Sequence, residues 1–466
     1  MTGGHRLTGG MSEATRHAAV DKPPVRGPAQ VRPVARAPYV LGIAYLLLAY
    51  VRPHEFAHWL DDVPILPIVL VLALVAWMAG SPRPLRVPQV PAGIGLLVAI
   101  AVSVAASGWA GGAVTMTLDF LPILLVAALI ASCTDTLSRL RGLMVLFVCV
   151  GIVLVAHGIE QSIHGVGWTG AKPVEDGRIT YLGFMNDPND LARVFVITIP
   201  FALHLAVRST SKIVKVVCVA ALPLLFHGIV LTNSRGAFLA VIALVALMVA
   251  RRHGWLKASM LAPPLVAGLL ILAPSRMDDL SADEDSAAGR VEAWYAGFEM
   301  LKEHPLFGVG KGGFVDHHVL TAHNSFVLAY AELGLFGYFF WLAIVIATFR
   351  MLRELIGATD PARRGASQHG AADGNEAERV EINALARTLF GSYVGLTVTS
   401  LFLSRSYELT LFVMIGLVMA LYLTATTVVP GLQLRRLRDI APQVLAWVAG
   451  TIVFFWLVTR ILLQYG

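Results

Sequence analysis

The sequence predicts an all-α, polytopic integral membrane protein with about twelve to thirteen transmembrane helices. Of its 466 residues 56% are hydrophobic and only 14% are charged, whereas soluble domains carry about 25% charged residues. The mean hydropathy is +0.70, and apolar runs close to the length of a bilayer crossing recur along the chain. This composition excludes a soluble, fibrous or disordered protein. The three cysteines lie in or beside apolar runs, so we expect neither a disulfide framework nor a metal-spaced cluster.

Thirteen apolar runs define the predicted spans, and the first and fourth of them are short. They are Val40–Val51, Val63–Ala79, Ala92–Trp109, Phe120–Ser132, Leu140–Ala156, Leu191–Val207, Ile213–Leu231, Phe238–Ala250, Ser259–Ala273, Leu335–Thr348, Leu389–Leu403, Leu409–Leu423 and Val444–Val458.

The distribution of basic residues predicts the orientation. Residues 1–37 are rich in Pro, Arg and Gly and lack the apolar segment of a cleaved signal, so we expect a disordered cytoplasmic tail. With this tail inside, 25 of the 36 basic residues fall on the cytoplasmic side, as the positive-inside rule requires. The carboxyl terminus then lies outside.

The spans divide the chain into predicted regions, of which the long outer loops are the natural place for a site. The regions are the tail 1–37, the first nine spans in 38–273 with an outer loop at 157–189, a periplasmic loop at 274–322, and the last spans in 323–466 with a cytoplasmic loop at 350–387.

Arg235 is the first candidate, because it occupies a tight turn on the side of the membrane that is poor in basic residues. It lies in the segment Thr232-Asn-Ser-Arg-Gly-Ala-Phe238 between two spans. The structural alternative is an arginine that snorkels to the membrane interface.

Arg290 opens a segment in which apolar residues recur at helical spacing: Val291, Trp294, Phe298 and Leu301. This spacing predicts an amphipathic helix on the outer surface. The alternative is that Arg290 only pairs with the acidic run before it, which contains Asp278, Asp279, Asp283, Glu284 and Asp285.

His323 lies where the periplasmic loop ends, in Thr321-Ala-His-Asn-Ser-Phe326. A histidine titrates near neutral pH and accepts a proton from an attacking hydroxyl. A single histidine is more often structural, and His317 and His318 are equally available by composition.

The glycine-rich segment Pro305–Phe314 resembles two nucleotide motifs and fits neither. Gly308, Gly310 and Gly313 match G-x-G-x-x-G, but they do not follow a strand, and Lys311 is followed by Gly312 instead of Ser or Thr. These glycines are expected to bend the loop back to the bilayer, and no nucleic acid or nucleotide partner is predicted.

Two further groups complete the candidate site. Asn189 or Asp190 is expected to cap the helix that follows, while Asp187, Asp190 and Arg193 could line a polar mouth. Glu332 is either buried in a span that starts at His323, or lies on a short surface helix that ends at Gly334. The second arrangement costs less because it keeps a carboxylate out of hydrocarbon.

These residues together resemble the O-antigen ligase and O-antigen polymerase superfamily, which also includes protein O-oligosaccharyltransferases. The resemblance is carried by Ser234-Arg-Gly-Ala237, Arg290-Val-Glu-Ala-Trp294, Pro305-Leu-Phe-Gly-Val-Gly310, Ala322-His-Asn-Ser325 and Glu332-Leu-Gly-Leu-Phe-Gly337, in this order. It is strongest over about residues 180–350.

The resemblance implies an inverting, metal-independent transfer of a glycan from an undecaprenyl-diphosphate donor to an acceptor hydroxyl at the periplasmic face. It assigns Arg235 and Arg290 to the donor diphosphate and His323 to the acceptor hydroxyl. Asp187, Asp190, Arg193 and Glu332 are expected to bind substrate, and no cofactor or metal is expected. The acceptor is a glycan, a lipid A core or a protein hydroxyl, and the sequence leaves ligase and polymerase open. The thirteenth span, Val444–Val458, exceeds the usual twelve of the family, and Asn186-Asp-Pro-Asn-Asp190 is more typical of polymerase-like or exopolysaccharide-linked members.

The main alternative from another class is a flippase or transporter of lipid-linked sugars. Such a protein would carry substrate-coordinating charges within spans of both halves, whereas the conspicuous charges here cluster outside the spans. A thiol-dependent membrane peptidase is disfavoured because none of the three cysteines falls in the outer loops.

Overall fold

The predicted all-α membrane architecture is confirmed by the computed structural model, which describes residues 34–56, 63–80, 82–174, 177–254, 256–260, 263, 287–361 and 376–465. Twelve long helices occupy twelve of the thirteen predicted spans. They are α1 (Arg36–Val51), α2 (Ile65–Ala79), α3 (Gln89–Ala106), α4 (Ala110–Cys133), α5 (Leu137–His164), α6 (Pro188–Arg208), α7 (Lys212–Thr232), α8 (Arg235–His253), α12 (Ser325–Ala358), α13 (Glu376–Ser400), α14 (Leu409–Ala425) and α15 (Leu437–Tyr465).

The remaining elements are short or lie between the long helices. They are the 3₁₀ helices η1 (Pro53–Phe56) and η4 (Gly183–Met185), and the helices α10 (Ala287–Glu303) and α11 (Phe314–His317). Eight described helices are long and apolar enough to cross a membrane, and α1, α2 and α14 are shorter apolar helices. The protein is therefore a multi-pass membrane protein.

The fourth span is longer than the sequence suggested, because Gly111 and Gly112 belong to the helix and not to a loop. The ring of Trp109 occupies the space in which a Cβ on Gly112 would lie, so glycine lets the indole pack against the first turn of α4. By contrast, most of the predicted ninth span, Ser259–Ala273, and all of the predicted tail before Val34 lie outside the described residues.

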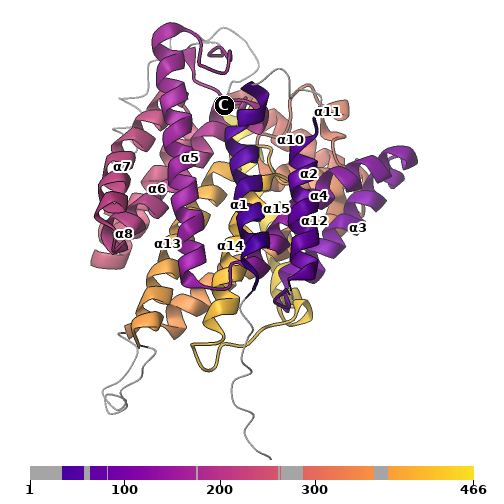
Figure 1. The fold of residues 1–466 in the computed structure, drawn as a ribbon. Coiled ribbons are helices and arrows are strands. Elements are labelled where there is room, and N and C mark those ends of the chain that lie inside the picture. Colours follow the sequence, from indigo (N-terminus) through magenta and orange to yellow (C-terminus); the bar gives the residue numbers. More distant parts are fainter. Residues whose placement is uncertain are drawn as a thin grey trace, which may run out of the picture. The chain divides into compact units, whose positions relative to one another are not determined.

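The two ends of the helix bundle differ in composition. At one end, called the site end here, α6, α8, α12 and α14 begin and α10 and α11 lie; at the other, called the basic end, α6, α8, α12 and α14 finish (Figure 1). The basic end carries most of the described arginines and lysines, including Arg83, Arg139, Arg208, Arg251 and Arg350.

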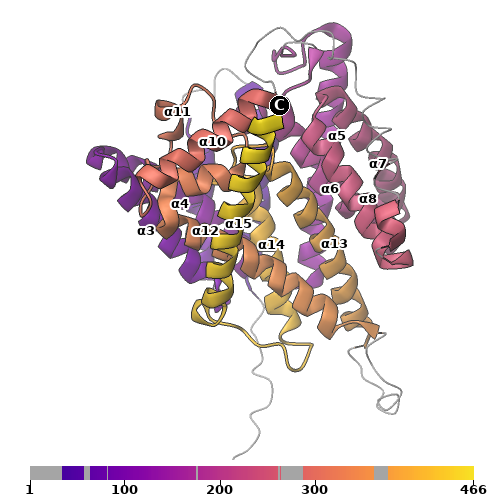
Figure 2. The same cartoon turned by 180° about the vertical axis from the view of Figure 1, so that it is seen from behind.

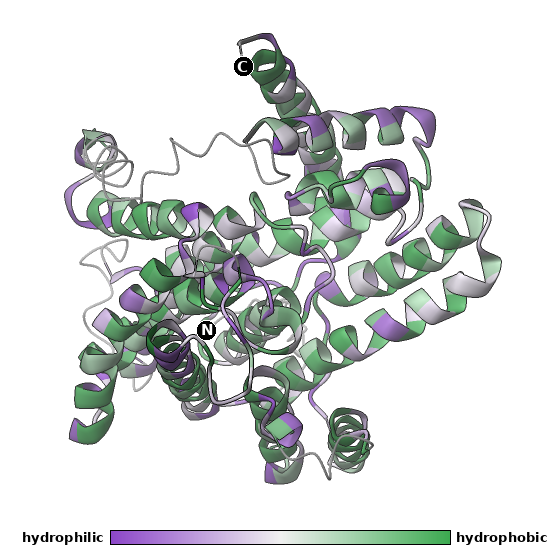
Figure 3. Ribbon diagram, turned by 90° about the horizontal axis from the view of Figure 1, so that it is seen from above, coloured by the Kyte–Doolittle hydropathy of each residue, from purple (hydrophilic) through white to green (hydrophobic). Residues whose placement is uncertain are grey.

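The centre of the bundle is formed by α14 and α12. Every residue of α14 is buried, and this helix packs against α4, α12 and α13. A helix that is hydrophobic on all sides belongs at such a position. Seen from behind, α7 lies at the edge of the bundle and α15 in front of it (Figure 2). These two helices expose large apolar side chains, including Ile213, Val216, Phe454 and Leu457, as expected of helices that face lipid. Hydrophobic residues make up most of each long helix when the bundle is viewed along its axis (Figure 3).

Helix α12 is broken at Gly334, where φ is 60° and ψ is −169°. The break frees backbone groups, and the glycine-rich loop pairs with them: Val309 and Gly310 donate to the carbonyls of Ala331 and Glu332 at 3.0 Å each. On the other side of the break, the amides of Leu335 and Phe336 donate to Pro305 and Leu306, at 2.8 and 3.1 Å. Broken helices are tolerated in membranes only where protein satisfies the freed groups, as it does here. The loop therefore bends back to the bundle as predicted.

Candidate functional site

Caps at the end of α7 and at the start of α8 fix the turn that carries Arg235. Helix α7 ends at Asn233 in the left-handed region (φ 48°), and the Ser234 side chain accepts a hydrogen bond from the amide of Ala237 to cap α8. Arg235 is thus the first residue of α8, and its side chain is exposed at the site end. Gly236 lies directly against Phe402 of the segment between α13 and α14, where a Cβ would come within 3.0 Å of Phe402 Cβ.

Arg290 lies in the first turns of α10, which exists as predicted and packs across α12 and α15. Gly297 allows the close crossing, because a Cβ there would come within 2.6 Å of Val327 Cγ1. Trp294 packs against Phe455 of α15 at a ring-centroid distance of 5.9 Å, and Phe455 in turn contacts Phe326 of α12. The first turn of α12, just after His323, therefore lies under α10. The acidic run 278–285 lies outside the described residues.

His323 is held in an unusual backbone conformation immediately before α12. Its φ of 46° lies in the left-handed region, which is uncommon for a residue other than glycine and tends to occur where surrounding contacts fix it. Those contacts are present: the fully buried Asn324 side chain accepts hydrogen bonds from Phe326 and Val327, and Thr321 bonds to Ser404 at 2.9 Å.

The segment Leu401–Glu408, called the α13–α14 loop here, joins the two places that carry Arg235 and His323. Ser325 donates to the Leu403 carbonyl at 2.6 Å and accepts from the Arg405 amide at 3.0 Å. Ser406 donates to the Ser325 carbonyl at 2.7 Å. With Phe402 packed on Gly236, this loop fixes the start of α8 relative to the start of α12. The structure therefore places Arg235, Arg290 and His323 at the site end.

The predicted polar mouth formed by Asp187, Asp190 and Arg193 is instead mostly buried. Arg193 is 0% exposed and Asp190 1% exposed, and Arg193 pairs with Asp190 at 3.2 Å and with Glu408. Asp190 also accepts from Arg405, with Oδ2 2.7 Å from Nε. Two guanidinium groups and two carboxylates thus compensate one another, which is what burial of charge requires.

The predicted cap of α6 was wrong. Asp187, and neither Asn189 nor Asp190, is the N-cap, because α6 begins earlier, with Pro188 in its first turn. The Asp187 carboxylate accepts from the Asn189 amide at 2.7 Å. Because Asp190 does not cap the helix, its carboxylate can pair with Arg405.

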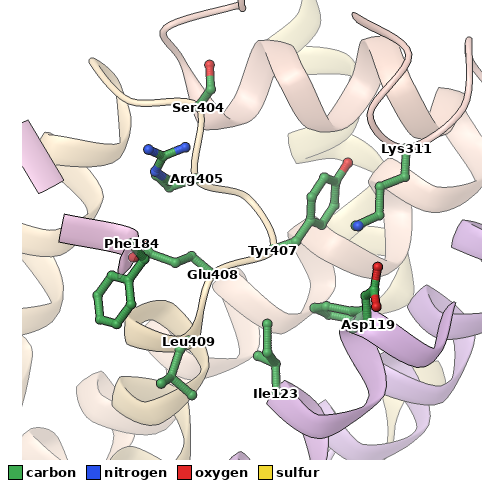
Figure 4. A pocket seen from close by; sticks show the side chains of 10 residues that line it. Asp119, Ile123, Phe184, Lys311, Ser404, Arg405, Tyr407, Glu408 and Leu409 are labelled. Carbon is green, nitrogen blue, oxygen red and sulfur yellow. The ribbon is translucent and has the colours of Figure 1, made fainter. Parts of the chain in front are cut away.

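A cavity of about 420 Å³ opens beside this network (Figure 4). It is formed by three elements and two loops. Its lining residues are Asp119, Phe120 and Ile123 of α4, Phe184 of η4, Lys311 of the glycine-rich loop, Ser404, Arg405, Tyr407 and Glu408 of the α13–α14 loop, and Leu409 of α14. Ligand pockets commonly measure about 300–1,000 Å³ and combine aromatic walls with few polar groups. This cavity has both properties, and Ser404 links it to the turn of His323.

Burial and neighbouring charges shift the pKa values of three side chains in the cavity wall. Burial lowers the pKa of Lys311, although the negative charges of Glu332 and Asp119 oppose this shift. Burial, reinforced by the charge of Glu332, raises the pKa of Tyr407 well above its usual value. Burial alone would lower the pKa of Arg405, but the Asp190 carboxylate outweighs it, so the pKa is raised. Arg405 therefore stays charged, whereas the charge of Lys311 depends on its neighbours.

Glu332, a predicted substrate ligand, is buried behind the cavity, with only 3% of its surface exposed. Both sequence alternatives hold in part: a helical segment does end at Gly334, yet Glu332 is enclosed by protein and does not lie on the surface. Its Oε1 accepts from the Gly312 amide at 2.9 Å, and Ser103 donates to its carbonyl. Glu332 thus anchors the loop that carries Lys311.

Sequence reasoning missed most residues of the cavity. Arg405, Tyr407 and Glu408 form a short polar segment between two apolar runs on the predicted outer side, which is the same pattern that singled out Arg235. Asp119 is a single carboxylate inside an apolar run, and such residues mark functional sites by default. Lys311 was considered only as part of a rejected nucleotide motif.

Residues 219–342 match a family model described as O-antigen ligase, which confirms the resemblance found in the sequence. The match begins in α7 and ends in α12, so it contains Arg235, Arg290 and His323, whereas Asp119 and Arg405 lie outside it. No curated protein matches the chain.

Proposed function

We propose that this membrane protein, a member of the O-antigen ligase superfamily by its match over residues 219–342, transfers a glycan from an undecaprenyl-diphosphate donor to an acceptor hydroxyl. At the family level the match supports ligase- or polymerase-type glycan transfer. The observation that carries the proposal is the presence of Arg235, Arg290 and His323 at one end of the bundle, on three different elements within the matched region.

In this proposal Arg235 and Arg290 bind the diphosphate leaving group. Each occupies the first turn of a helix, where the macrodipole favours an anion and disfavours a cation. A diphosphate at these two helix starts is therefore attracted by backbone amides as well as by guanidinium groups, which bind phosphate oxygens in bidentate fashion. Both interactions strengthen as negative charge develops on the leaving group.

In this proposal His323 is the base that acts on the acceptor hydroxyl. In the proposed step the acceptor oxygen forms a bond to the anomeric carbon from the face opposite the diphosphate, and the bond from that carbon to the diphosphate oxygen breaks. The proton of the attacking hydroxyl passes to the imidazole of His323. The anomeric configuration inverts, and the diphosphate leaves with the bonding electrons on undecaprenyl diphosphate. The fixed turn at Thr321–Ser325 supports this role, because a base must be held in place.

The site end is proposed to face the periplasm and the basic end the cytoplasm of the bacterial inner membrane. Support comes from the arginines and lysines gathered where α6, α8 and α12 finish. A membrane-impermeant thiol reagent should label cysteine introduced at the exposed His317 from outside the cell, and cysteine at Arg252 only after permeabilisation. Labelling in the reverse pattern would contradict the proposed location of the site.

The function is tested by reconstituting the purified protein with an undecaprenyl-diphosphate oligosaccharide and candidate acceptors: lipid A core, a second lipid-linked glycan and a protein. Formation of one new glycosidic bond together with free undecaprenyl diphosphate is expected, and EDTA should leave the rate unchanged because two arginines supply the positive charge. Movement of the intact lipid-linked glycan across vesicles without bond formation would instead support the flippase alternative. Loss of activity in EDTA with recovery on adding a divalent ion would contradict a metal-independent reaction.

A further inference from the structure

The cavity between α4, η4, Lys311 and the α13–α14 loop differs electrostatically from the positions of Arg235 and Arg290. Its charged lining consists of two acidic residues, Asp119 and Glu408, and two basic residues, Lys311 and Arg405. Glu408 is paired with Arg193, and Arg405 with Asp190. The cavity therefore presents no excess positive charge to attract a diphosphate, but it offers hydrogen-bond donors and acceptors side by side.

Lys311 and Asp119 are the groups most available to a ligand. Lys311 forms no ion pair within the described part of the chain, and its ammonium lies 3.5 Å from Met116 Sδ and 5.7 Å from the centre of the Tyr407 ring. Asp119 is exposed although it lies well inside the apolar helix α4. In Figure 4 the two side chains lie on the same side of the cavity and are directed toward one another. A carboxylate at this depth is accommodated by a polar, hydrated cavity.

Aromatic rings supply the other walls. Tyr407 and Phe120 pack edge to face at 6.1 Å, and Phe184 lies on the opposite side of the cavity (Figure 4). A sugar ring has apolar C–H faces that pack on aromatic rings and a rim of hydroxyl groups that both donate and accept hydrogen bonds. Neutral, hydroxyl-rich ligands fit this combination of rings and opposite charges better than a dianion does.

We propose that this cavity binds a neutral sugar unit of the acceptor, with Asp119 accepting from its hydroxyls, Lys311 donating to them and Tyr407 packing on its ring. The proposal rests on the proposed glycan transfer and adds to it a separate place for the second substrate. The position fits, because Ser404 in the cavity wall bonds to Thr321, two residues before His323. An acceptor held here presents a hydroxyl toward the base, while the donor diphosphate binds at Arg235 and Arg290.

The test measures occupancy of the cavity without turnover. In a Cys149→Ala background, which removes the one exposed cysteine among the described residues, Ser404→Cys places a thiol in the cavity wall. The probes are the free oligosaccharides of the two glycan acceptors used for reconstitution, the lipid A core and the second lipid-linked glycan, and, separately, inorganic pyrophosphate. Saturating oligosaccharide is expected to slow maleimide labelling roughly tenfold, whereas pyrophosphate should not slow it.

Two variants and one control distinguish binding in the cavity from general effects of mutation on labelling. Asp119→Asn and Lys311→Met should each remove most of the protection by the oligosaccharide, while Lys302→Met, on the exposed surface of α10, should keep it. Protection by pyrophosphate and not by oligosaccharide would overturn the proposal in favour of a phosphate site, and protection by neither would overturn it outright. Protection in a protein that forms no glycosidic bond would leave the cavity assignment standing and contradict the proposed transfer.

Discussion

The arginines at the two ends of the bundle differ in what they do for the fold. At the basic end, Arg83 donates to the carbonyls of Ala131 and Ala420 at 3.0 and 3.2 Å, near the ends of α4 and α14. Arg139 likewise donates to the Cys133 carbonyl at 2.8 Å. Ala131 and Cys133 belong to the last turn of α4, so these two arginines satisfy carbonyls that the helix end leaves open, and they complement the dipole of α4.

At the site end, two arginines lie at the starts of helices instead of beside helix ends. Arg235 is the first residue of α8 and Arg290 lies in the first turn of α10, so both oppose the dipole of their own helix. The helix dipole alone therefore disfavours a cation at these two positions. The comparison teaches that the contacts of an arginine separate a structural role from a ligand-binding one: Arg139 lies in the first turn of α5 and still bonds to the Cys133 carbonyl, whereas the Arg235 side chain is exposed. Four sets of variants test the difference between the two ends.

The largest effect is expected for His323→Ala, which removes the base from the site end. A positioned base contributes roughly 10²- to 10⁴-fold to a rate, so transfer should fall by that factor, whereas donor affinity should remain near normal because the base acts only during attack. Transfer rate and donor affinity on monodisperse protein give the measurement. His317→Ala, in the exposed helix α11, is the matched control. A folded His323→Ala protein with normal transfer, or a larger loss in His317→Ala, would contradict the assignment.

The next largest effect is on stability and concerns the buried charges of the site end. Asp190→Asn removes the carboxylate that both Arg193 and Arg405 contact. Loss of one partner of a buried pair costs about 3–5 kcal/mol in the free energy of unfolding. Asp439→Asn, at the exposed start of α15 at the basic end, should cost less than about 1 kcal/mol. Thermal unfolding in detergent compares them, and equal midpoints would show that the buried network contributes little.

Arg235→Ala and Arg290→Ala should each slow transfer by roughly a hundredfold, about 3 kcal/mol, since each removes charge from the leaving diphosphate. Substitution by Lys should restore little, because an ammonium cannot make the bidentate contact. Arg252→Ala is the matched control, since Arg252 is exposed in the last turn of the same helix as Arg235. Steady-state rates at saturating acceptor measure the three variants. A comparable loss in the control would remove the distinction between the two ends.

Much of the fold could be predicted from the sequence, because apolar length and the alternation of basic residues are local properties. Helices are found at twelve predicted spans, and α10 follows from the spacing of its apolar residues. Boundaries were less certain where glycine or a break intervened. The fourth predicted span began at Phe120, whereas α4 already begins at Ala110, and the pairing of the Gly334 break with residues 305–310 depends on backbone groups that are far apart in sequence.

The site residues likewise fall into those that the local sequence predicts and those that depend on tertiary packing. Arg235, Arg290 and His323 could be nominated because each stands out within its own segment. The cavity could not be predicted, since Asp119 and Arg405 are separated by hundreds of residues and meet only through the packing of α4 on α14. The burial of Arg193 had a similar cause: its partner Glu408 lies beyond α7, α8, α10, α11, α12 and α13 in the sequence, so a polar mouth was the simpler expectation.

The smallest effect is expected for Glu332→Gln, which keeps an oxygen for the Gly312 amide but removes a negative charge from beside Lys311. The Glu332 charge counters the effect of burial on the pKa of Lys311. Without it the pKa of Lys311 falls further, so the ammonium loses its proton at a lower pH. If the charged ammonium holds the acceptor, KM for the acceptor rises as pH rises through this pKa, and that rise should begin at lower pH in Glu332→Gln.

At neutral or lower pH the turnover of Glu332→Gln should stay close to that of the unaltered protein, because the Glu332 side chain is buried and accepts a hydrogen bond from the Gly312 amide of the loop. The measurement is KM for the acceptor as a function of pH. Glu299→Gln is the control: its carboxylate pairs with the exposed Lys302 at 2.9 Å on α10, so its profile should not move. A shift of the Glu332→Gln profile to higher pH would show that Lys311 does not hold the acceptor in its charged form. A collapse of turnover at all pH values in folded protein would make Glu332 a substrate ligand after all.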